Sequence, residues 1–234
     1  MLGKETDLKG KVIVITGASR GIGMETALSF AKEGCKLALT YFNSEKESKE
    51  IAEKCKENGA GDVLFVKLDV RDNNSIKQAV KKIIERYNII NVLINNAGII
   101  DWKEFSEQSI ESIQNQVRTN LEGLIMMTKE CFPYIKETII NISSGAGKQG
   151  FGDLTTYCAT KFGVRGFTQA LADGYPKLKV YSANPGMTAT RMTNFKGAPA
   201  SEVAGVIVNV AKGKYKVESG GDVDVWKVMG VGMY

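Results

Sequence analysis

Residues 11–23, KVIVITGASRGIG, set the architecture of the whole chain. Lys11 to Thr16 form a β-branched run typical of a buried strand, and Gly17 to Gly23 lead from it directly into a helical stretch. Glycine lets a backbone approach a pyrophosphate closely, and the free N–H groups at a helix N-terminus bind its negative charge. A tight turn that needs glycine only for its dihedral angles is the alternative interpretation. The spacing is G-x-x-x-G-x-G, which differs from the ordinary dinucleotide-binding fingerprint G-x-G-x-x-G.

Short β-branched runs alternate with helical stretches along the rest of the chain, which is typical of βαβ units and of a parallel sheet buried on both faces. The pattern predicts strands at Lys11 to Thr16, Lys36 to Tyr41, Val63 to Leu68, Asn91 to Asn95, Thr138 to Ser143, Lys179 to Ala183 and Asp222 to Trp226. It predicts helices at about Gly21 to Glu33, Ser44 to Asn58, Asn73 to Tyr87, Ser109 to Lys136, Thr155 to Gly174 and Ser201 to Lys212. We therefore expect an α/β, doubly wound, Rossmann-like fold: a seven-stranded parallel sheet with helices on both faces, in a single domain over residues 1–234.

The composition fits one soluble globular domain, since 43% of the 234 residues are hydrophobic and 24% are charged. The net charge of +5 is spread without a basic block, so we expect no nucleic-acid partner, although an anionic ligand would be favoured. Residues 1–10 carry no apolar signal-peptide core, and no stretch approaches the roughly 18 apolar residues of a membrane span. We expect a cytoplasmic protein without membrane contact.

The chain contains no histidine, which excludes Ser/His/Asp and Cys/His nucleophiles and every His-ligated metal site. Its four cysteines are far apart in sequence and form no CxxC pair, so neither a metal site nor a disulfide framework is predicted. Any acid–base chemistry must use other side chains.

Tyr157 and Lys161 place a phenol and an ammonium on one helical face, one turn apart. A cation within about 4 to 6 Å can lower a phenol pKa by about 1 to 3 units from its usual value of about 10, which gives an acid–base group without histidine. Tyr175 and Lys179 have the same spacing, but Pro176 disfavours a helical Tyr175, so we interpret Tyr175 as a helix-end residue.

Residues that directly follow the predicted strands are further candidates, because ligands of such sheets bind beyond the carboxyl ends of the strands. Asn96, Ala97 and Gly98 follow the fourth strand and would leave room for a ribose and a nicotinamide. Ser144 follows the fifth strand, thirteen residues before Tyr157, where its hydroxyl would face the same crevice. An ordinary turn is the alternative at both places.

Together and in this order, the glycine segment, Asn95 to Gly98, Ser144 and Tyr157-x-x-x-Lys161 resemble the short-chain dehydrogenase/reductase family. The resemblance runs from about Lys11 to Met192 and is with the compact single-domain branch, including the 3-oxoacyl-acyl-carrier-protein reductases. It includes a Pro-Gly-x-x-x-Thr segment at residues 185–190.

The resemblance implies that Tyr157 donates the proton in reduction and accepts it in oxidation, while Lys161 holds the ribose hydroxyls and lowers the tyrosine pKa. It implies that Ser144 binds the substrate oxygen and that Asn120 positions a water linking Lys161 to solvent. Asp69 would bind the adenine amino group. The residues expected to bind the cofactor are Gly17, Ser19, Arg20, Gly21, Ile22, Gly23, Tyr41, Asn43, Asp69, Val70, Asn96, Ala97, Gly98, Tyr157, Lys161, Pro185, Gly186, Thr188 and Thr190.

The end of the second predicted strand distinguishes the two nicotinamide cofactors. An acid there would bind the adenosine ribose and repel a 2′-phosphate. Tyr41 and Asn43 stand there instead, with no carboxylate before Glu45, and Arg20 could pair with the phosphate. NADP(H) is therefore the predicted cofactor, and NAD(H) stays open as an alternative. The alternative for Arg20 is a solvent-exposed loop charge that does not bind the cofactor.

We expect an oxidoreductase that transfers a hydride between nicotinamide and a carbonyl or secondary alcohol, with a 3-oxoacyl thioester on an acyl carrier protein as one candidate substrate. A catalytically silent nucleotide sensor or interaction protein on the same fold is the alternative. A methyltransferase-like protein is disfavoured, because its chemistry does not call for the tyrosine and lysine.

Three further regions carry expectations of their own. Arg191 to Ala200 are few residues for a substrate lid, which predicts an open substrate side, and Trp102 is a loop aromatic that could instead line the pocket. Apolar residues on more than one face of the helices at Ser109 to Lys136 and Thr155 to Gly174 predict a homotetramer or a dimer. In the second helix they are Phe162, Val164, Phe167, Leu171 and Ala172.

Overall fold

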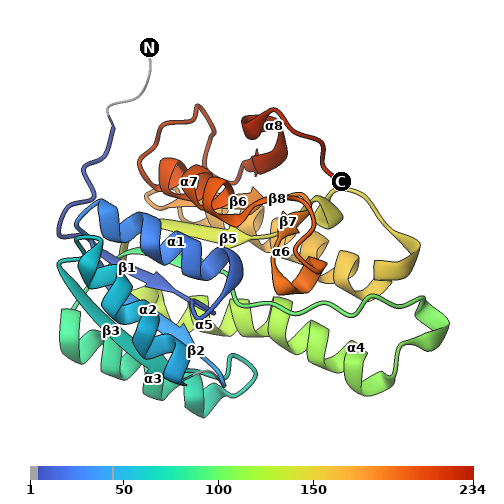
Figure 1. The fold of residues 1–234 in the computed structure, drawn as a ribbon, viewed down its shortest axis with the longest axis horizontal. Helices are drawn as coiled ribbons and strands as arrows, with labels where there is room; N and C mark the ends of the chain where they lie inside the picture. Colours follow the sequence, from blue (N-terminus) through green and yellow to red (C-terminus); the bar gives the residue numbers. More distant parts are fainter. Residues whose placement is uncertain (1–4, 44) are drawn as a thin grey trace.

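Seven strands form a single parallel sheet in the computed structural model, which describes residues 5–43 and 45–234. Their order across the sheet is β3-β2-β1-β4-β5-β6-β9, and every neighbouring pair is parallel (Figure 1). The strands are β1 (Val12–Ile15), β2 (Lys36–Tyr41), β3 (Asp62–Lys67), β4 (Ile90–Asn95), β5 (Ile135–Ile142), β6 (Lys179–Asn184) and β9 (Asp222–Asp224). The predicted α/β Rossmann-like fold is confirmed.

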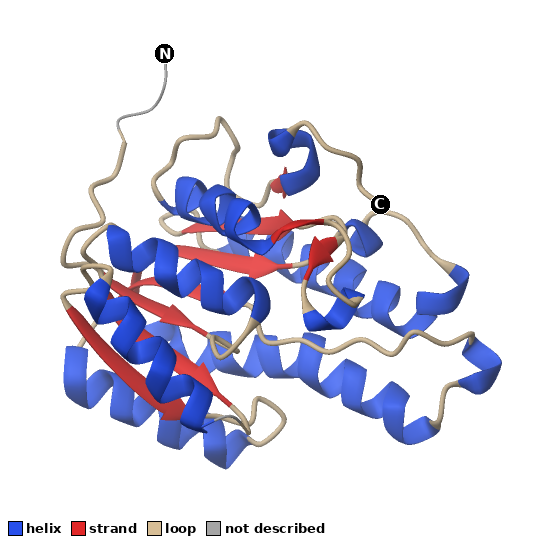
Figure 2. Cartoon of the chain, in the orientation of Figure 1, coloured by secondary structure: helices blue, strands red, loops and turns tan. Residues whose placement is uncertain are grey.

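Helices cover both faces of this sheet (Figure 2). They are α1 (Gly21–Lys32), α2 (Glu45–Glu57), α3 (Asn73–Tyr87), α4 (Ile110–Val117), α5 (Gly123–Cys131), α6 (Thr155–Gly174), α7 (Ala200–Ala211) and α8 (Val225–Met229). A separate two-stranded ladder pairs β7 (Thr188–Ala189) with β8 (Ala198–Pro199).

The side chains of β1 explain why both faces need cover. Ile13 and Ile15 enter a core shared with α1, α2 and α7, whereas Val12 and Val14 enter a second core shared with α3, α5 and α6. All four are almost completely buried. Successive side chains of a strand point to opposite faces, so an uninterrupted apolar run requires a layer of helices on each side.

Buried amides join β4 and β5 at their carboxyl ends. Asn95 Nδ2 donates to Asn141 Oδ1 at 2.8 Å and to Thr128 Oγ1 of α5 at 2.8 Å. Asn141 Nδ2 in turn donates to Thr168 Oγ1 of α6 at 2.9 Å. Because buried polar groups are costly when unpaired, this chain of bonds fixes two strands and two helices relative to one another, directly beneath the strand ends.

The predicted long helix from Ser109 to Lys136 is wrong in two respects. A π-helical turn, Arg118–Glu122, separates α4 from α5, and the helical segment ends at Cys131 with a 3₁₀ turn at Phe132–Tyr134. Proline has no N–H and fits only the first turn of a helix, so Pro133 stops α5, and β5 begins at Ile135.

The predicted last strand is also too long, since β9 ends at Asp224 and Trp226 belongs to α8. Periodicity cannot distinguish a strand from a buried helix in so short an apolar run. Most of the remaining predicted helices and strands agree with the structure to within one residue, and α3, α6 and β2 agree at both ends, but β5 begins at Ile135, three residues before the predicted start at Thr138. Ser44, the predicted first residue of α2, lies outside the described residues.

In the part of the chain that the structure describes, no helix has the length and apolarity needed to cross a membrane. The carboxyl ends of β1 and β4 lie side by side at the point where the strand order reverses, which is where open parallel sheets bind their ligands.

Candidate active site

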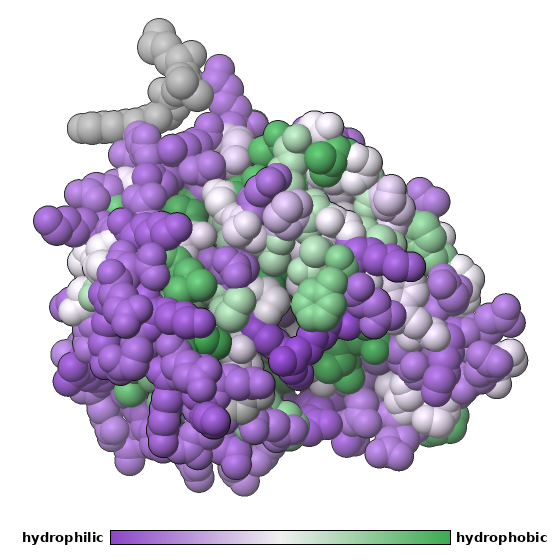
Figure 3. Space-filling view, in the orientation of Figure 1, coloured by the Kyte–Doolittle hydropathy of each residue, from purple (hydrophilic) through white to green (hydrophobic). Residues whose placement is uncertain are grey.

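A cavity of about 1050 Å³ runs along the carboxyl ends of the strands. Every residue that the sequence predicted for the site lines it, except Asn120. The surface over α2 and α3 is mostly hydrophilic, whereas more apolar side chains lie over β7, β8 and α8 (Figure 3). The cavity therefore has two chemically different ends.

The glycine segment forms a backbone cradle at the first end. Gly17 and Gly21 have φ values of +67° and +55°, in the left-handed region that favours glycine. A Cβ on Gly23 would lie 2.4 Å from the carbonyl oxygen of Gly17 and 2.5 Å from Asn96 Nδ2, so α1 could not start this close to the turn with any other residue. The glycines thus allow the backbone conformation of the turn and bring backbone N–H groups to the cavity.

The N-terminus of α1 lies at this cradle without a side-chain cap. Its N-cap residue, Arg20, makes no capping hydrogen bond, which leaves the first N–H groups of the helix directed at the cavity. A pyrophosphate fits such a place because it satisfies those donors and its charge is attracted by the helix dipole.

Asp69 lies farther along the same end, after β3. The Arg71 guanidinium binds its carboxylate with both arms, at 2.9 and 2.8 Å, and holds the pKa of Asp69 below its usual value. Arg71 also lies 5.1 Å from the centre of the Phe42 ring. Arg71 was not among the residues predicted for the site, although its position two residues after Asp69 was a usable signal.

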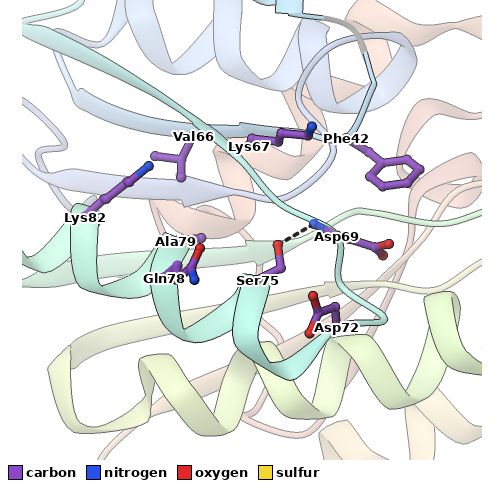
Figure 4. A pocket seen from close by; sticks show the side chains of 9 residues that line it. All are labelled: Phe42, Val66, Lys67, Asp69, Asp72, Ser75, Gln78, Ala79 and Lys82. Carbon is purple, nitrogen blue, oxygen red and sulfur yellow. Dashed lines mark hydrogen bonds between the residues drawn. The ribbon is translucent and has the colours of Figure 1, made fainter.

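A smaller pocket of about 340 Å³ adjoins Asp69 on the side of α3 (Figure 4). The backbone N–H of Asp69 donates to Ser75 Oγ at 2.9 Å, which ties the end of β3 to the first turns of that helix. Asp69 and Phe42 line both pockets and so separate them.

Ser144, Tyr157 and Lys161 meet in the middle of the cavity. Ser144 follows β5, its hydroxyl accepts a hydrogen bond from the N–H of Ala146 at 3.1 Å, and it also bonds to Tyr157. Lys161 Nζ donates to the carbonyl oxygen of Ile142 at 2.9 Å and lies 5.5 Å from the centre of the Tyr157 ring. The structure thus places the phenol, the hydroxyl and the ammonium in one cavity.

The expected lowering of the Tyr157 pKa is not found. Burial raises the pKa of Tyr157 to about 12, and the hydrogen bond with Ser144 offsets only part of this effect. Burial also lowers the pKa of Lys161 to about 8. Both side chains are less than 9% exposed, and removal from water disfavours the charged form of each group.

Asn120 is fully buried in the π-helical turn and lies behind the cavity wall. Its Oδ1 accepts from the N–H of Ile99 at 2.8 Å, and its Nδ2 donates to the carbonyl oxygen of Ile99 at 2.8 Å. A Cβ on Gly98 would lie 3.3 Å from Asn120 Oδ1 and 3.7 Å from Lys161 Nζ, so this glycine keeps the space between the two groups clear.

Tyr175 lies away from the cavity, as the sequence predicted. It is the C-cap residue of α6, is 48% exposed, and packs edge-to-face against Phe132. The tyrosine and lysine spacing that includes Lys179 is therefore coincidental.

The substrate side is bridged, in contrast to the expected open side. Trp102 lines the cavity, and its indole N–H donates to the carbonyl oxygen of Met192 at 2.9 Å. The short segment after β7 thus reaches the loop after β4 without a longer helical lid. Tyr234 also lines the cavity at this end, and no motif in the sequence signalled it.

Comparison with known proteins agrees with this geometry. The family model described as short chain dehydrogenase matches residues 11–200. The chain belongs to the short-chain dehydrogenase family. It is therefore an oxidoreductase, which agrees with the names of similar proteins.

Members of this family from two bacteria resemble the chain over most of its length. A 3-oxoacyl-acyl-carrier-protein reductase of Thermotoga maritima is 36% identical over 203 residues, 84% of this chain and 82% of that protein. The reductase of the same name from Synechocystis is 34% identical over 194 residues, 80% of this chain and 78% of the other. A Thermotoga maritima protein described as an uncharacterized oxidoreductase is 36% identical over 189 residues, 78% of this chain and 73% of that protein.

Solved structures of short-chain dehydrogenases share the fold. One from Shigella flexneri, described as complexed with NADP, has a TM-score of 0.87 and 26% identity, and the match covers 94% of this chain and 98% of the other. One from Burkholderia cenocepacia, also with NADP, has a TM-score of 0.86 at 23% identity over 93% of this chain and 97% of the other.

Proposed function

We propose that this short-chain dehydrogenase reduces a carbonyl group with NADPH, and oxidises the corresponding secondary alcohol in reverse, within a single domain spanning residues 1–234. The observation that carries the proposal is the convergence of Ser144, Tyr157 and Lys161 on a cavity whose other end is the glycine cradle. A catalytically silent nucleotide sensor would need none of the three groups there.

Ser144 and Tyr157 would share the work of binding the substrate oxygen. The hydroxyl of Ser144 donates a hydrogen bond to that oxygen as negative charge develops on it. Tyr157 transfers its proton to the same oxygen, and its raised pKa keeps the phenol protonated and ready to donate near neutral pH. When bound, the nicotinamide supplies the hydride.

Lys161 would stabilise the phenolate that Tyr157 leaves behind. Its Nζ is already held by the Ile142 carbonyl oxygen at 2.9 Å, and the remaining N–H groups are available for ribose hydroxyls. Asn120 holds the backbone at Ile99, and a Cβ on Gly98 would lie close to both Asn120 Oδ1 and Lys161 Nζ, at 3.3 and 3.7 Å. We propose that it positions the water that connects Lys161 to solvent.

NADP is the proposed cofactor because the end of β2 carries no carboxylate. Tyr41 and Asn43 line the cavity there, and Arg20 stands at the N-terminus of α1 with an exposed guanidinium that can pair with a 2′-phosphate. NADP in the structures of similar proteins is consistent with this choice. NAD stays open as an alternative.

A 3-oxoacyl thioester on an acyl carrier protein is a candidate substrate, because two similar proteins are named as reductases of such thioesters. The net charge of +5 suits an acidic carrier.

Replacing Tyr157 with Phe keeps the ring and removes the proton donor. We expect turnover with NADPH and a carbonyl substrate to fall by about two orders of magnitude or more, the usual scale of general acid–base catalysis, while cofactor affinity is retained. The absorbance of NADPH over time measures turnover, and fluorescence titration with NADPH measures cofactor affinity. Tyr175→Phe is the matched control, and retention of turnover in Tyr157→Phe together with its loss in the control would show that the wrong tyrosine has been chosen.

Replacing Arg20 with Ala should weaken NADPH binding much more than NADH binding, because only NADPH presents a 2′-phosphate for a charge-assisted bond. Fluorescence titration of both cofactors against the variant and the unchanged protein measures the difference. Equal losses for the two cofactors would contradict the assignment of Arg20 to the phosphate.

We also propose a homotetramer, or failing that a dimer, formed through α4, α5 and α6. Phe162 on α6 and Val117 on α4 are 45% and 39% exposed and could contact a partner. Val164 and Ala172 are buried in the core of the chain itself and could not. Closed symmetric assemblies commonly bury such faces. We expect light scattering at micromolar concentration to give the mass of four or two chains, and a monomer mass would reject the interface.

A further inference from the structure

The segment after α8 returns to the catalytic cavity. Gly230 ends α8 with φ +69°, and residues 231–234 then run toward the strand ends, where Figure 1 shows the end of the chain. The carbonyl oxygen of Met233 accepts a hydrogen bond from the N–H of Met187, just after β6, at 2.9 Å. A backbone bond therefore holds this segment beside the Pro-Gly segment of the site.

Two glycines of the site make room for it. A Cβ on Gly145 would lie 2.7 Å from Met233 Sδ and 2.9 Å from the hydroxyl oxygen of Tyr234, and a Cβ on Gly186 would lie 2.5 Å from the carbonyl oxygen of Met233. Neither glycine has a positive φ, so their backbone conformations do not require glycine. The absence of a side chain at both positions is explained by the packing of residues 233 and 234 against them.

The ring of Tyr234 forms a wall next to the catalytic groups. It packs edge-to-face on Phe151, with ring centres 4.6 Å apart, and lines the same cavity as Ser144 and Tyr157. Gly145 directly follows Ser144, so the contact at Gly145 places the Tyr234 hydroxyl beside the backbone that carries Ser144. Burial raises the pKa of Tyr234 to about 12, which keeps this wall uncharged near neutral pH.

The rest of this end is mostly apolar, although Arg191 also lines the cavity and lies 3.8 Å from a carboxylate oxygen of Glu47. Side chains of Ile100, Trp102, Leu154, Met187 and Met192 line it together with Tyr234. The nearby ammonium of Lys148 is bound to Asp224 at 2.8 Å and to Asp222 at 3.4 Å. A carboxylate substrate would find this cation already paired, whereas a neutral apolar group would find surface to contact.

We propose that Tyr234 determines substrate size: its ring closes the pocket beside Tyr157, so that the group attached to the reacting carbonyl must be compact and apolar. This rests on the proposed function. A bulky group would have to displace the ring from Phe151, while a compact one would fit against it. Tyr234 contacts the substrate in this proposal and takes no part in proton transfer.

Two ketones of different size test the proposal on the full chain: cyclohexanone and 4-phenylcyclohexanone, each reduced with NADPH. In Tyr234→Ala we expect the kcat/KM ratio of the bulky to the compact ketone to rise about tenfold or more, the range that a few methylene groups gain in an apolar pocket. In Tyr234→Phe, which keeps the ring, we expect the ratio to stay within about twofold of the unchanged protein.

Tyr175→Ala is a matched control, because Tyr175 is 48% exposed against 53% for Tyr234 and also packs edge-to-face on a phenylalanine with ring centres 4.6 Å apart. An unchanged ratio in Tyr234→Ala, a uniform loss for both ketones, or the same rise in Tyr175→Ala or Tyr234→Phe would overturn the proposal. Melting temperature and NADPH affinity show whether each variant is folded.

Failure of the proposed function has a different signature, namely NADPH binding without reduction of either ketone by the unchanged protein. The effect of the Tyr234 ring is then tested by calorimetry, which measures the affinities of the cofactor-loaded protein for cyclohexanol and 4-phenylcyclohexanol. A selective gain in affinity for the larger alcohol in Tyr234→Ala supports the wall. Equal affinities in Tyr234→Ala and the unchanged protein overturn it.

Discussion

The hydrogen bond from the buried ammonium of Lys161 to the carbonyl oxygen of Ile142 joins α6 to the end of β5, and the geometry of the candidate site depends on it. A charge with only 4% of its side chain exposed is costly unless it is bonded. The hydrogen bond to Ile142 offsets this cost, and it holds the ammonium where it faces both Tyr157 and the cavity. The ammonium, the phenol and the serine hydroxyl are then positioned by a single contact between a helix and a strand end.

Further bonds hold that contact in place. Ser143 Oγ donates to the carbonyl oxygen of Lys161 at 2.9 Å, and Arg165 donates to the carbonyl oxygen of Gly147 at 2.7 Å. The same guanidinium binds Asp222 of β9 with both arms, at 2.9 and 2.6 Å. Below the site, the amides of Asn95 and Asn141 join the two central strands. Helix, loop and sheet therefore support the site as one rigid unit, which is what precise positioning for catalysis requires.

The fold and the predicted site residues that line the cavity follow from local sequence patterns, whereas Arg71 and Tyr234, which also line the cavity, were not predicted. Apolar runs of β-branched residues define parallel strands, and the residues after them meet at one edge of the sheet. The helix predicted from residue 109 to 136 is wrong because Pro133 ends it early and because a π-helical turn, which has no simple sequence signal, interrupts it. These failures concern local structure that proline and tertiary packing decide.

Two properties of the site could not be predicted from spacing. The pKa of Tyr157 depends on how completely the ring is buried, and burial outweighs the hydrogen bond with Ser144. Tyr234 reaches the site through contacts with Gly145 and Phe151, more than eighty residues away in sequence, and no motif marks such a contact. The residues proposed to bind the cofactor can therefore be predicted from sequence motifs, whereas the apolar end of the cavity is built from long-range packing.

The pKa of Lys161 tests the central claim most directly, because it reports whether the ammonium is buried against β5 as described. Lysine labelled with ¹³C at Cε can be followed by NMR as a function of pH in the full chain, and the signal missing from Lys161→Met identifies the residue. Burial against β5 lowers the pKa of this lysine to about 8, which is the value expected in the titration. A value near the usual 10.5 would contradict it, since the side chain would then be solvated and could not hold Tyr157 and the strand end together.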